Sequence, residues 1–211
     1  MANRRISTRR LHLDQALMRK SKEEAENTRR RIVSAAAAEF RQRGIVATGL
    51  NDLMQAAGLT HGGFYRHFDS KEQLVTEATD EALDELIKRI AEAASRGRSR
   101  GRSAGGLAAA VKEYLSLQHR DNPRDGCPIA AMGSELTRSG TKTREAVTAG
   151  FQKLVETLAG EFEGIRPDQS KKRALAAAVT LVGALTISRI VTDPALSKAI
   201  LREAANSVSW P

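Results

Sequence analysis

The sequence predicts an all-α fold in two parts: a small N-terminal unit of three helices that contains a helix-turn-helix, and a larger C-terminal helical bundle. Apolar residues recur at helical spacing along most of the 211 residues, no segment alternates at the period of a strand, and Gly58 separates two short helical segments. Hydrophobic residues make up 41% and aromatic residues 4%, which is typical of Ala- and Leu-rich helices. We place the first unit at residues 21–70, after a basic arm at 1–20, and the bundle at 71–211.

The first helix is expected to begin at Ser21. Ser21–Glu24 has the S-x-x-E form of a capping box, in which the hydroxyl and the carboxylate satisfy free backbone N–H groups. Ile32, Ala36 and Phe40 then recur at four-residue spacing and form one apolar face. Gly44 marks the end of this helix.

The next two helices are expected to meet at a tight corner. Leu53 and Met54 belong to a short apolar-periodic segment that closes at Gly58, and Thr60 offers an N-cap for the helix that follows. Two short helices joined by three or four residues with a glycine in the turn are typical of a helix-turn-helix.

A longer helix is expected to start at Asp69–Glu72 and to connect the first unit to the bundle. The Arg-, Gly- and Ser-rich run at 95–103 predicts a flexible loop and is too short to support RNA binding by itself. Five more helices are expected at 107–119, 128–138, 143–163, 170–191 and 195–207, with Pro123, Pro128, Pro167 and Pro194 at their boundaries.

The charge distribution points to an anionic partner for one end of the chain. The net charge is +9 with a pI near 10.1, and residues 1–22 carry seven basic residues against one acidic residue. Apart from four arginines at 96–102, the chain from residue 76 onward is slightly acidic. The bundle is therefore not expected to bind a polyanion.

Several classes of protein are disfavoured by what the sequence lacks. Cys127 is the one cysteine, which excludes an internal disulfide and fits a reducing cytoplasm. No leader-like apolar segment follows the basic N-terminus, and no stretch has the ~20 apolar residues of a membrane span, so we expect a cytoplasmic protein. Without a phosphate loop, a nucleotide-binding glycine motif or Cys/His metal-ligand spacing, we expect no enzyme activity, cofactor or metal.

The densest motif runs from Thr48 to Leu74: TGLNDLMQAAGLTHGGFYRHFDSKEQL. It resembles the helix-turn-helix of the TetR family of transcription regulators in its Ala-Ala-Gly turn, its Phe-Tyr-x-His-Phe segment and its Ser-Lys-Glu helix start. The resemblance covers residues 28–75. It departs from the family pattern at Gly49 and Gly63, where a hydroxyl residue and a Thr, Ser or Val are usual, and each change removes a possible DNA contact.

The residue chemistry of this motif suits a helix that enters a DNA groove. Gly62 and Gly63 permit close backbone approach, His61 and Arg66 offer donors, and Phe64 is expected to face the core with Phe68. The resemblance implies phosphate contacts for Tyr65, His67, Thr48 and Lys71, with His61 and Gly62 near bases. The full set of expected DNA-contacting residues is Thr28, Arg29, Thr48, Thr60, His61, Gly62, Gly63, Tyr65, Arg66, His67 and Lys71. A glycine-capped helical corner without DNA contacts is the alternative.

The basic arm at 1–20 has two interpretations. It could reach into an adjacent minor groove and add electrostatic affinity, or it could be an ordinary disordered tail.

The resemblance implies a homodimer paired through the last two helices. Residues 174–191 are too apolar for a solvent-facing helix, and a symmetric dimer would place two reading helices about one DNA turn apart, ~34 to 36 Å. The alternative is the core helix of a monomer.

A ligand cavity is expected inside the bundle, because helical bundles build pockets from facing helices. The candidate lining residues are Tyr114, Gln118, Cys127, Met132, Glu135 and Phe151, together with Leu117 and Leu136, although ordinary core packing explains most of them equally well. Cys127 precedes Pro128 at a helix start, where the helix dipole favours a thiolate, so it is either a small buried residue or a sensor of electrophiles or oxidants.

The resemblance therefore implies a ligand-responsive regulator, most simply a repressor that binds a pseudo-palindromic operator as a dimer and is released by a small molecule. Release would follow a population shift toward a spacing of the two heads that no longer fits the groove. An activator or a non-specific architectural DNA binder is the alternative.

Overall fold

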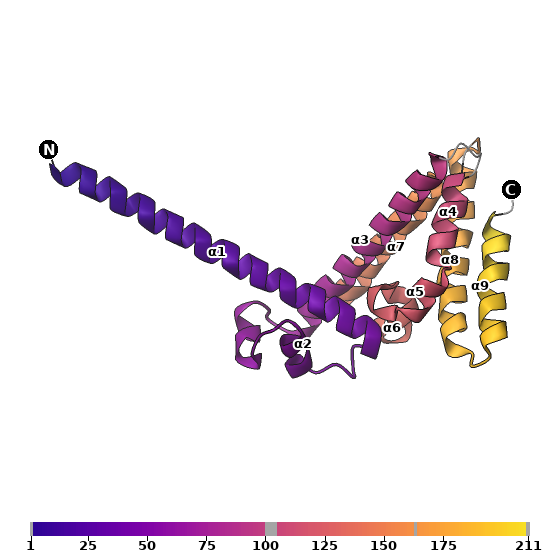
Figure 1. Cartoon of the computed structure of the whole chain (residues 1–211), viewed down its shortest axis with the longest axis horizontal. Helices are drawn as coiled ribbons and strands as arrows, with labels where there is room; N and C mark the ends of the chain where they lie inside the picture. The colour runs from indigo at the N-terminus through magenta and orange to yellow at the C-terminus, as the bar shows by residue number, and fades with distance from the viewer. Residues whose placement is uncertain (1, 100–104, 163, 210–211) are drawn as a thin grey trace.

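A computed structural model of the chain confirms the all-α fold (Figure 1). It describes residues 2–99, 105–162 and 164–209, with side chains from Lys22 to Val208 outside the two gaps. Within that part of the chain the elements are α-helices and two short 3₁₀-helices, with no strand. They form a head, made of α1, α2 and η1, and a body that runs from α3 to α9.

The head contains α1 (Ala2–Arg43), α2 (Leu50–Ala56) and the 3₁₀-helix η1 (His61–Arg66). Its core consists of fully buried apolar side chains from all three elements and the first turns of α3, including Ile32, Phe40, Leu53, Met54, Phe64, Phe68 and Leu74. The expected apolar face of the first helix and its end before Gly44 are both confirmed, and Gly44 has a left-handed φ of 88°.

The helix start predicted at Ser21 is wrong, because α1 begins at Ala2. Residues 2–20 contain neither glycine nor proline and are rich in Arg and Leu, so their helix propensity continues the helix through the capping-box residues. The side chains of this basic stretch lie outside the described residues.

The body consists of α3 (Lys71–Arg98), α4 (Gly105–Tyr114), α5 (Leu117–Asp121), the 3₁₀-helix η2 (Pro123–Asp125), α6 (Pro128–Leu136), α7 (Thr141–Ala159), α8 (Pro167–Ile190) and α9 (Pro194–Ser209). Figure 1 shows α3 and α7 side by side, with α8 and α9 at the far end from the head. Ser70 caps α3 by accepting a hydrogen bond from the Gln73 N–H at 3.1 Å, which confirms the predicted start of this helix.

Two predicted boundaries in the body are wrong. The loop expected from Ser95 is helical up to Arg98, since Gly97 is buried against α4: a Cβ there would lie 2.1 Å from the Gly105 carbonyl oxygen. The rest of that loop, residues 100–103, lies outside the described residues. The helix expected at 107–119 is broken at Ser116, whose extended backbone and side-chain bond to the His119 N–H at 3.1 Å start a separate helix.

Helix α8 is long and apolar enough to cross a membrane by length and composition, contrary to the expectation that no segment is. It packs against α7 and α9, and its buried residues include Ala174, Ala178, Leu181 and Leu185. Core helices of other proteins pass the same test of length and composition.

The head and the body share one contact region. Met132 and Leu136 of α6 belong to the same apolar cluster as the core of the head, together with the first turns of α3. The body therefore fixes the position of α2 and η1 through two of its helices.

Candidate nucleic-acid interface

The corner between α2 and η1 is formed by backbone hydrogen bonds. Gly58 has a left-handed φ of 70°, its N–H donates to the Gln55 carbonyl at 2.9 Å, and the Leu59 N–H donates to the Met54 carbonyl at 2.8 Å. The predicted glycine corner is thus present. The short helix expected after it is present as a 3₁₀-helix, with the His67 N–H bonded to the Phe64 carbonyl at 2.9 Å.

Two phenylalanines hold η1 on the head. Phe64 and Phe68 are fully buried, as expected, and their rings stack with centroids 5.5 Å apart. Burial of two such side chains contributes roughly 1.5 to 3 kcal/mol each. The residues between them on the opposite side of η1 are therefore held toward solvent.

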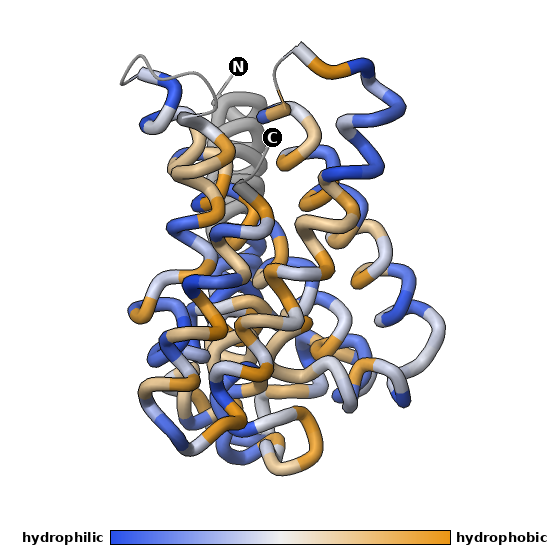
Figure 2. The backbone as a smooth tube through the Cα atoms, turned by 90° about the vertical axis from the view of Figure 1, so that its right-hand side faces the viewer, coloured by the Kyte–Doolittle hydropathy of each residue, from blue (hydrophilic) through white to orange (hydrophobic). Residues whose placement is uncertain are grey.

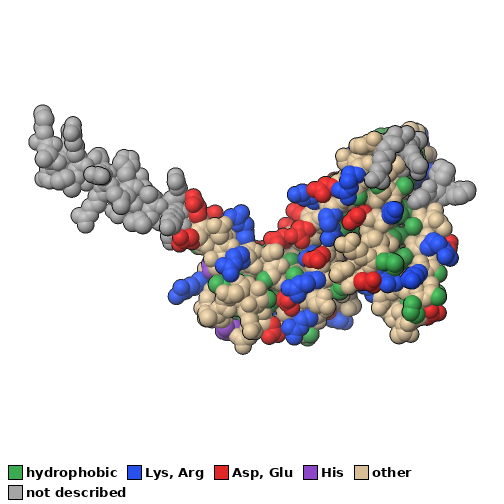
Figure 3. All heavy atoms as spheres, viewed as in Figure 1, with side chains coloured by type: hydrophobic (Ala, Val, Ile, Leu, Met, Phe, Trp, Pro, Cys, Tyr) green, Lys and Arg blue, Asp and Glu red, His purple; other side chains and the backbone are tan. Residues whose placement is uncertain are grey.

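The exposed side of η1, which we call the η1 face, consists of Thr60, His61, Gly62, Tyr65 and Arg66. Tyr65 is 67% exposed, and Thr60, although it occupies the N-cap, makes no capping bond with its side chain. Within the described part of the chain, no hydrogen bond engages the polar side-chain atoms of these residues. Figure 3 shows histidine side chains together with lysine and arginine on this part of the head. The η1 face thus offers a tyrosine hydroxyl, a threonine hydroxyl, an imidazole and a guanidinium to a partner.

The packing of the fold does not explain the glycine at position 62. A Cβ added to Gly62 would meet nothing within 4 Å, and one added to Gly63 would only touch Met54 at 3.6 Å. Neither has a positive φ. The absence of a side chain at Gly62 leaves the backbone of η1 open to close approach.

Other residues expected to touch DNA are bonded within the protein. Thr48 is fully buried and its hydroxyl donates to the Gly44 carbonyl at 2.6 Å, while Lys71 Nζ donates to the Ile45 carbonyl at 2.7 Å. The buried Thr48 hydroxyl would have to leave its bond to donate to a phosphate, whereas the half-buried Lys71 ammonium has further N–H donors beyond the one it uses here. The Thr28 hydroxyl donates to the Glu24 carbonyl at 2.8 Å.

Arg29 holds the end of η1 rather than projecting freely. Its guanidinium pairs with Glu77 of α3, with one N–H to oxygen distance of 2.7 Å, and its Nε donates to the His67 carbonyl at 3.3 Å. The same group lies 4.4 Å from the ring centroid of Phe68. This contact could not be inferred from the sequence, because the two charges are 48 residues apart.

Glu135 and Met132 lie against the head and not in a ligand cavity, which corrects the sequence prediction. Glu135 accepts hydrogen bonds from the backbone N–H groups of Ile45 at 3.0 Å and Val46 at 2.8 Å, in the loop between α1 and α2. Met132 is buried in the apolar cluster of the head. A carboxylate within an apolar helix is equally compatible with a place in a cavity and with a place against the head. The sequence pattern alone therefore predicted the wrong position.

A cavity of about 300 Å³ opens between α3, α4 and α5. Two expected ligand-binding residues, Tyr114 and Gln118, line it, together with Leu86, Arg89, Ile90, Glu113, Ser116, His119, Asn122 and Asp125. Phe151 instead packs half-buried against the core of the body. Within the described residues, no group of His, Cys, Asp and Glu is arranged to hold a metal ion.

His119 joins the cavity wall to the start of α6. Its Nδ1 lies 2.7 Å from the Tyr114 carbonyl, and its Nε2 accepts the Cys127 N–H at 2.9 Å, so the ring is neutral with the proton on Nδ1. Burial, chiefly, lowers the pKa of His119 to about 4, and nearby Arg189, Arg89 and Arg41 lower it further.

Cys127 is enclosed beneath this corner. Its side chain is fully buried beside Tyr114, and burial raises the pKa of the thiol despite its place at the N-cap of α6. These properties favour the interpretation of a packed residue over that of a reactive sensor.

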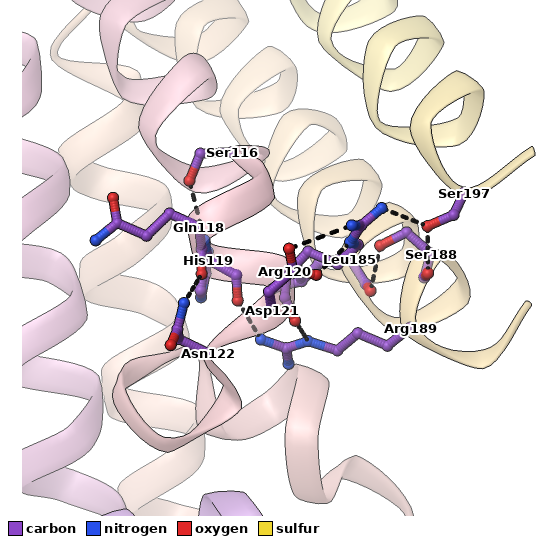
Figure 4. A network of polar contacts seen from close by, with 10 residues as sticks. All are labelled: Ser116, Gln118, His119, Arg120, Asp121, Asn122, Leu185, Ser188, Arg189 and Ser197. Atoms are coloured by element: carbon purple, nitrogen blue, oxygen red, sulfur yellow. Dashed lines mark hydrogen bonds and ion pairs between the residues drawn. The ribbon is translucent and has the colours of Figure 1, made fainter. Parts of the chain in front are cut away.

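The short helix α5 is tied to α8 and α9 (Figure 4). Arg189 of α8 donates to the carbonyls of His119 at 2.6 Å and Arg120 at 3.0 Å. Arg120 in turn donates to the Ser197 hydroxyl of α9 at 3.0 Å, and Ser197 donates to the Ser188 carbonyl at 2.6 Å. A change in the cavity wall is thus mechanically linked to the last two helices.

Two family descriptions match the chain. Residues 32–78 match "Bacterial regulatory proteins, tetR family", and residues 103–206 match "Transcriptional regulator LmrA/YxaF-like, C-terminal domain". The first match contains α2, η1 and their buried anchors, and the second contains the cavity-lining helices α4 and α5.

The chain is 30% identical over 176 residues to an HTH-type transcriptional regulator of Mycobacterium tuberculosis, covering 80% of this chain and 87% of that protein. It is 41% identical over 61 residues to a probable acrEF/envCD operon repressor of Escherichia coli, covering 29% of this chain and 28% of that one. The reduced form of Escherichia coli NemR shares the fold, with a TM-score of 0.73 at 21% identity over 86% of this chain and 95% of that chain. The chain belongs to the TetR family of transcriptional regulators.

Proposed function

We propose that this regulator is a cytoplasmic homodimer that represses transcription by binding a pseudo-palindromic operator and releases it when a small molecule enters the cavity between α3, α4 and α5. The observation that carries the DNA-binding part is the η1 face: five exposed residues, whose polar side-chain atoms on Thr60, His61, Tyr65 and Arg66 have no hydrogen-bond partner in the described chain, supported from behind by Phe64 and Phe68. Polar donors on a rigid exposed helix are what major-groove recognition requires.

The exposed apolar residues of α8 and α9 support a dimer. Leu175, Val179, Ile187 and Ile190 recur along one side of α8 with 49%, 60%, 51% and 71% of their surfaces exposed, and Leu196 of α9 is 48% exposed. Figure 2 faces this side of the molecule and shows hydrophobic segments along both helices. A second copy of the chain would cover these residues, and a two-fold axis here would present two η1 faces to successive turns of DNA.

Helix α6 supports a path from the cavity to the head. Its first turn receives the hydrogen bond between Cys127 and His119 of the cavity wall, and Glu135 in its last turn holds the backbone of Ile45 and Val46. Helix α6 is short, with 9 residues. A ligand that tilts its first turn therefore also moves its last turn, and with it the loop that precedes α2. The repressor assignment is supported by the Escherichia coli relative, which is named a probable operon repressor.

The DNA-binding proposal is tested by footprinting on the DNA that flanks the gene of this protein. A protected segment with two half-sites about one helical turn apart supports the dimeric operator. Equal affinity for random duplex of the same length would instead indicate a non-specific architectural binder. An increase of transcription from the protected promoter on adding the protein would indicate an activator.

Gly62→Ala tests the η1 face directly. Because a Cβ at this position meets nothing, the free energy of unfolding is expected to stay within about 0.5 kcal/mol of wild type, whereas close approach to a base edge is blocked and operator binding weakens at least about ten-fold. Gly133→Ala on α6, where an added Cβ also meets nothing, is the matched control: it leaves operator binding unchanged and raises the free energy of unfolding by roughly 0.5 to 1 kcal/mol, because a helix-interior glycine is replaced by alanine. Operator binding by Gly62→Ala equal to that of wild type would remove the main support for the proposal.

A further inference from the structure

Arg89 of α3 stands out among the residues that line the cavity. Its side chain is half-buried, its Nε is buried without a hydrogen-bond partner in the described chain, and no ion pair there engages its guanidinium. A buried N–H group without a partner is costly, so this arginine in the cavity wall calls for an anion or an acceptor that the protein itself does not supply.

A second unpartnered donor lies in the same wall. The Tyr114 side chain is fully buried and its hydroxyl has no hydrogen-bond partner of normal geometry among the described residues. Burial raises the pKa of Tyr114 well above its usual value, and the neighbouring Cys127 raises it further. The hydroxyl therefore keeps its proton and remains a hydrogen-bond donor, with the weakly accepting sulfur of Cys127 beside it.

Two more arginines stand behind the wall, around Gly126. Arg41 Nη1 donates to the Gly126 carbonyl at 3.3 Å, and a Cβ on Gly126 would lie 2.9 Å from Arg189 Nη2 and from the His119 ring. Arg41 Nε and Arg189 Nη1 are also buried without partners in the described chain. The buried side of the cavity thus carries an excess of hydrogen-bond donors.

The carboxylates near the cavity are distributed differently. Glu85 is half-exposed and lies 3.6 Å from Arg41, Asp125 of η2 is exposed, and Glu113 of α4 is half-buried on the lining. Water screens the exposed carboxylates of Glu85 and Asp125, whereas the buried Arg41 and the half-buried Arg89 and Arg189 are screened less, against the one half-buried carboxylate of Glu113. His119 is neutral and adds no charge. The inner wall is therefore positive although the formal charges of the surroundings nearly balance.

We propose that the cavity takes a small molecule with a carboxylate group, which the guanidinium of Arg89 binds and to which the Tyr114 hydroxyl donates a further hydrogen bond. Arginine is suited to this because its planar fork of donors matches the two oxygens of a carboxylate. The inference rests on the proposed function in that the cavity is taken as the effector site, and it adds the chemical class of the effector.

The test compares carboxylates with their uncharged amides on the full-length protein: benzoate against benzamide, and 2-naphthoate against 2-naphthamide. The melting temperature and calorimetric binding are measured at constant ionic strength for wild type, Arg89→Met, Arg89→Lys and the exposed control Arg144→Met of α7. The carboxylates are expected to stabilise wild type and Arg144→Met more than the amides do. In Arg89→Met, carboxylate binding weakens at least about ten-fold, the loss expected for a charge-assisted pair of hydrogen bonds, and Arg89→Lys keeps part of the preference.

The unliganded variants separate a binding role from a structural one. Because Arg89→Met removes a buried unpartnered nitrogen and keeps the apolar stem, its melting temperature without ligand stays equal to or above that of wild type. A lower value with unchanged carboxylate preference would make Arg89 a structural residue and overturn the inference. So would equal stabilisation by amides, or no stabilisation by any carboxylate of the set. Carboxylate binding through Arg89 without loss of operator binding would leave the inference standing and overturn the proposed effector role.

Discussion

His119 is the residue on which the cavity wall depends most. It is a neutral base held between a carbonyl acceptor on one nitrogen and a backbone donor on the other, so protonation of Nε2 would place two donors face to face at 2.9 Å. Its pKa of about 4 in the folded protein lies below the ordinary value of 6.5. The unfolded chain therefore binds the proton more readily than the native protein between these two values.

This difference predicts how stability depends on pH. The stabilisation due to the neutral ring is complete above pH 6.5 and is lost as the pH falls toward 4, by at most about 1.4 kcal/mol per pH unit. Urea unfolding at pH 7, 6 and 5 measures it. His119→Gln, whose amide offers one donor and one acceptor, is the comparison: it should be less stable at pH 7 but lose less stability on acidification. Parallel pH profiles for the two proteins would refute the shift.

Single residues were predictable where a local pattern has one physical solution. Phe64 and Phe68 were expected in the core and are buried there, because an apolar pair at four-residue spacing can face only one side. Glu135 was expected in the ligand cavity and instead binds the head, since the spacing shows that its helix is amphipathic but not which element faces it. The expected DNA contacts stay predictions.

Among the elements, α6 connects the two parts of the molecule. Glu135→Ala removes the acceptor of two backbone N–H groups in the loop before α2, and we expect a loss of about 1 to 3 kcal/mol in the free energy of unfolding and weaker operator binding. Glu135→Gln keeps one acceptor oxygen and should lie between. Urea unfolding and operator titration measure both effects, with the exposed Glu145→Ala on α7 as control. If Glu135→Ala matched that control, the loop would not depend on α6.

Element boundaries were predictable where a cap or a proline fixes them. Ser70, Pro128 and Pro167 stand at helix starts as expected, because a side-chain acceptor or a missing N–H has a defined place in the first turn. Two predicted boundaries were wrong for one reason: the helix start at the Ser21 capping box and the loop start at the glycines near 97. Each pattern describes a local preference. The helix propensity of residues 2–20 outweighed the capping box, and the close packing of Gly97 against α4 outweighed the glycine-rich pattern.

At the scale of the whole molecule, the two-fold assembly decides whether the η1 faces can act together. The fold class followed from periodicity, but the partner surface could only be guessed from the apolar run at 174–191. The structure divides that run: Leu181 and Leu185 are fully buried within the chain, whereas Val179 and Ile187 point outward. A sequence cannot make this division, because both sets are apolar and lie within a few residues of each other on one helix.

Val179→Asp tests the assembly. Val179 is 60% exposed in the single chain, so an aspartate there leaves the monomer folded with unchanged helical circular dichroism. In a dimer it would bury an unpaired charge on each side of the axis, which costs several kcal/mol and raises the dissociation constant at least about hundred-fold. Sedimentation velocity over a range of concentrations measures this, with Thr148→Asp on the exposed side of α7 as control. Since each half-site alone provides too few contacts, operator affinity should fall in parallel with dimerisation, and a Val179→Asp protein that stays dimeric would place the interface elsewhere.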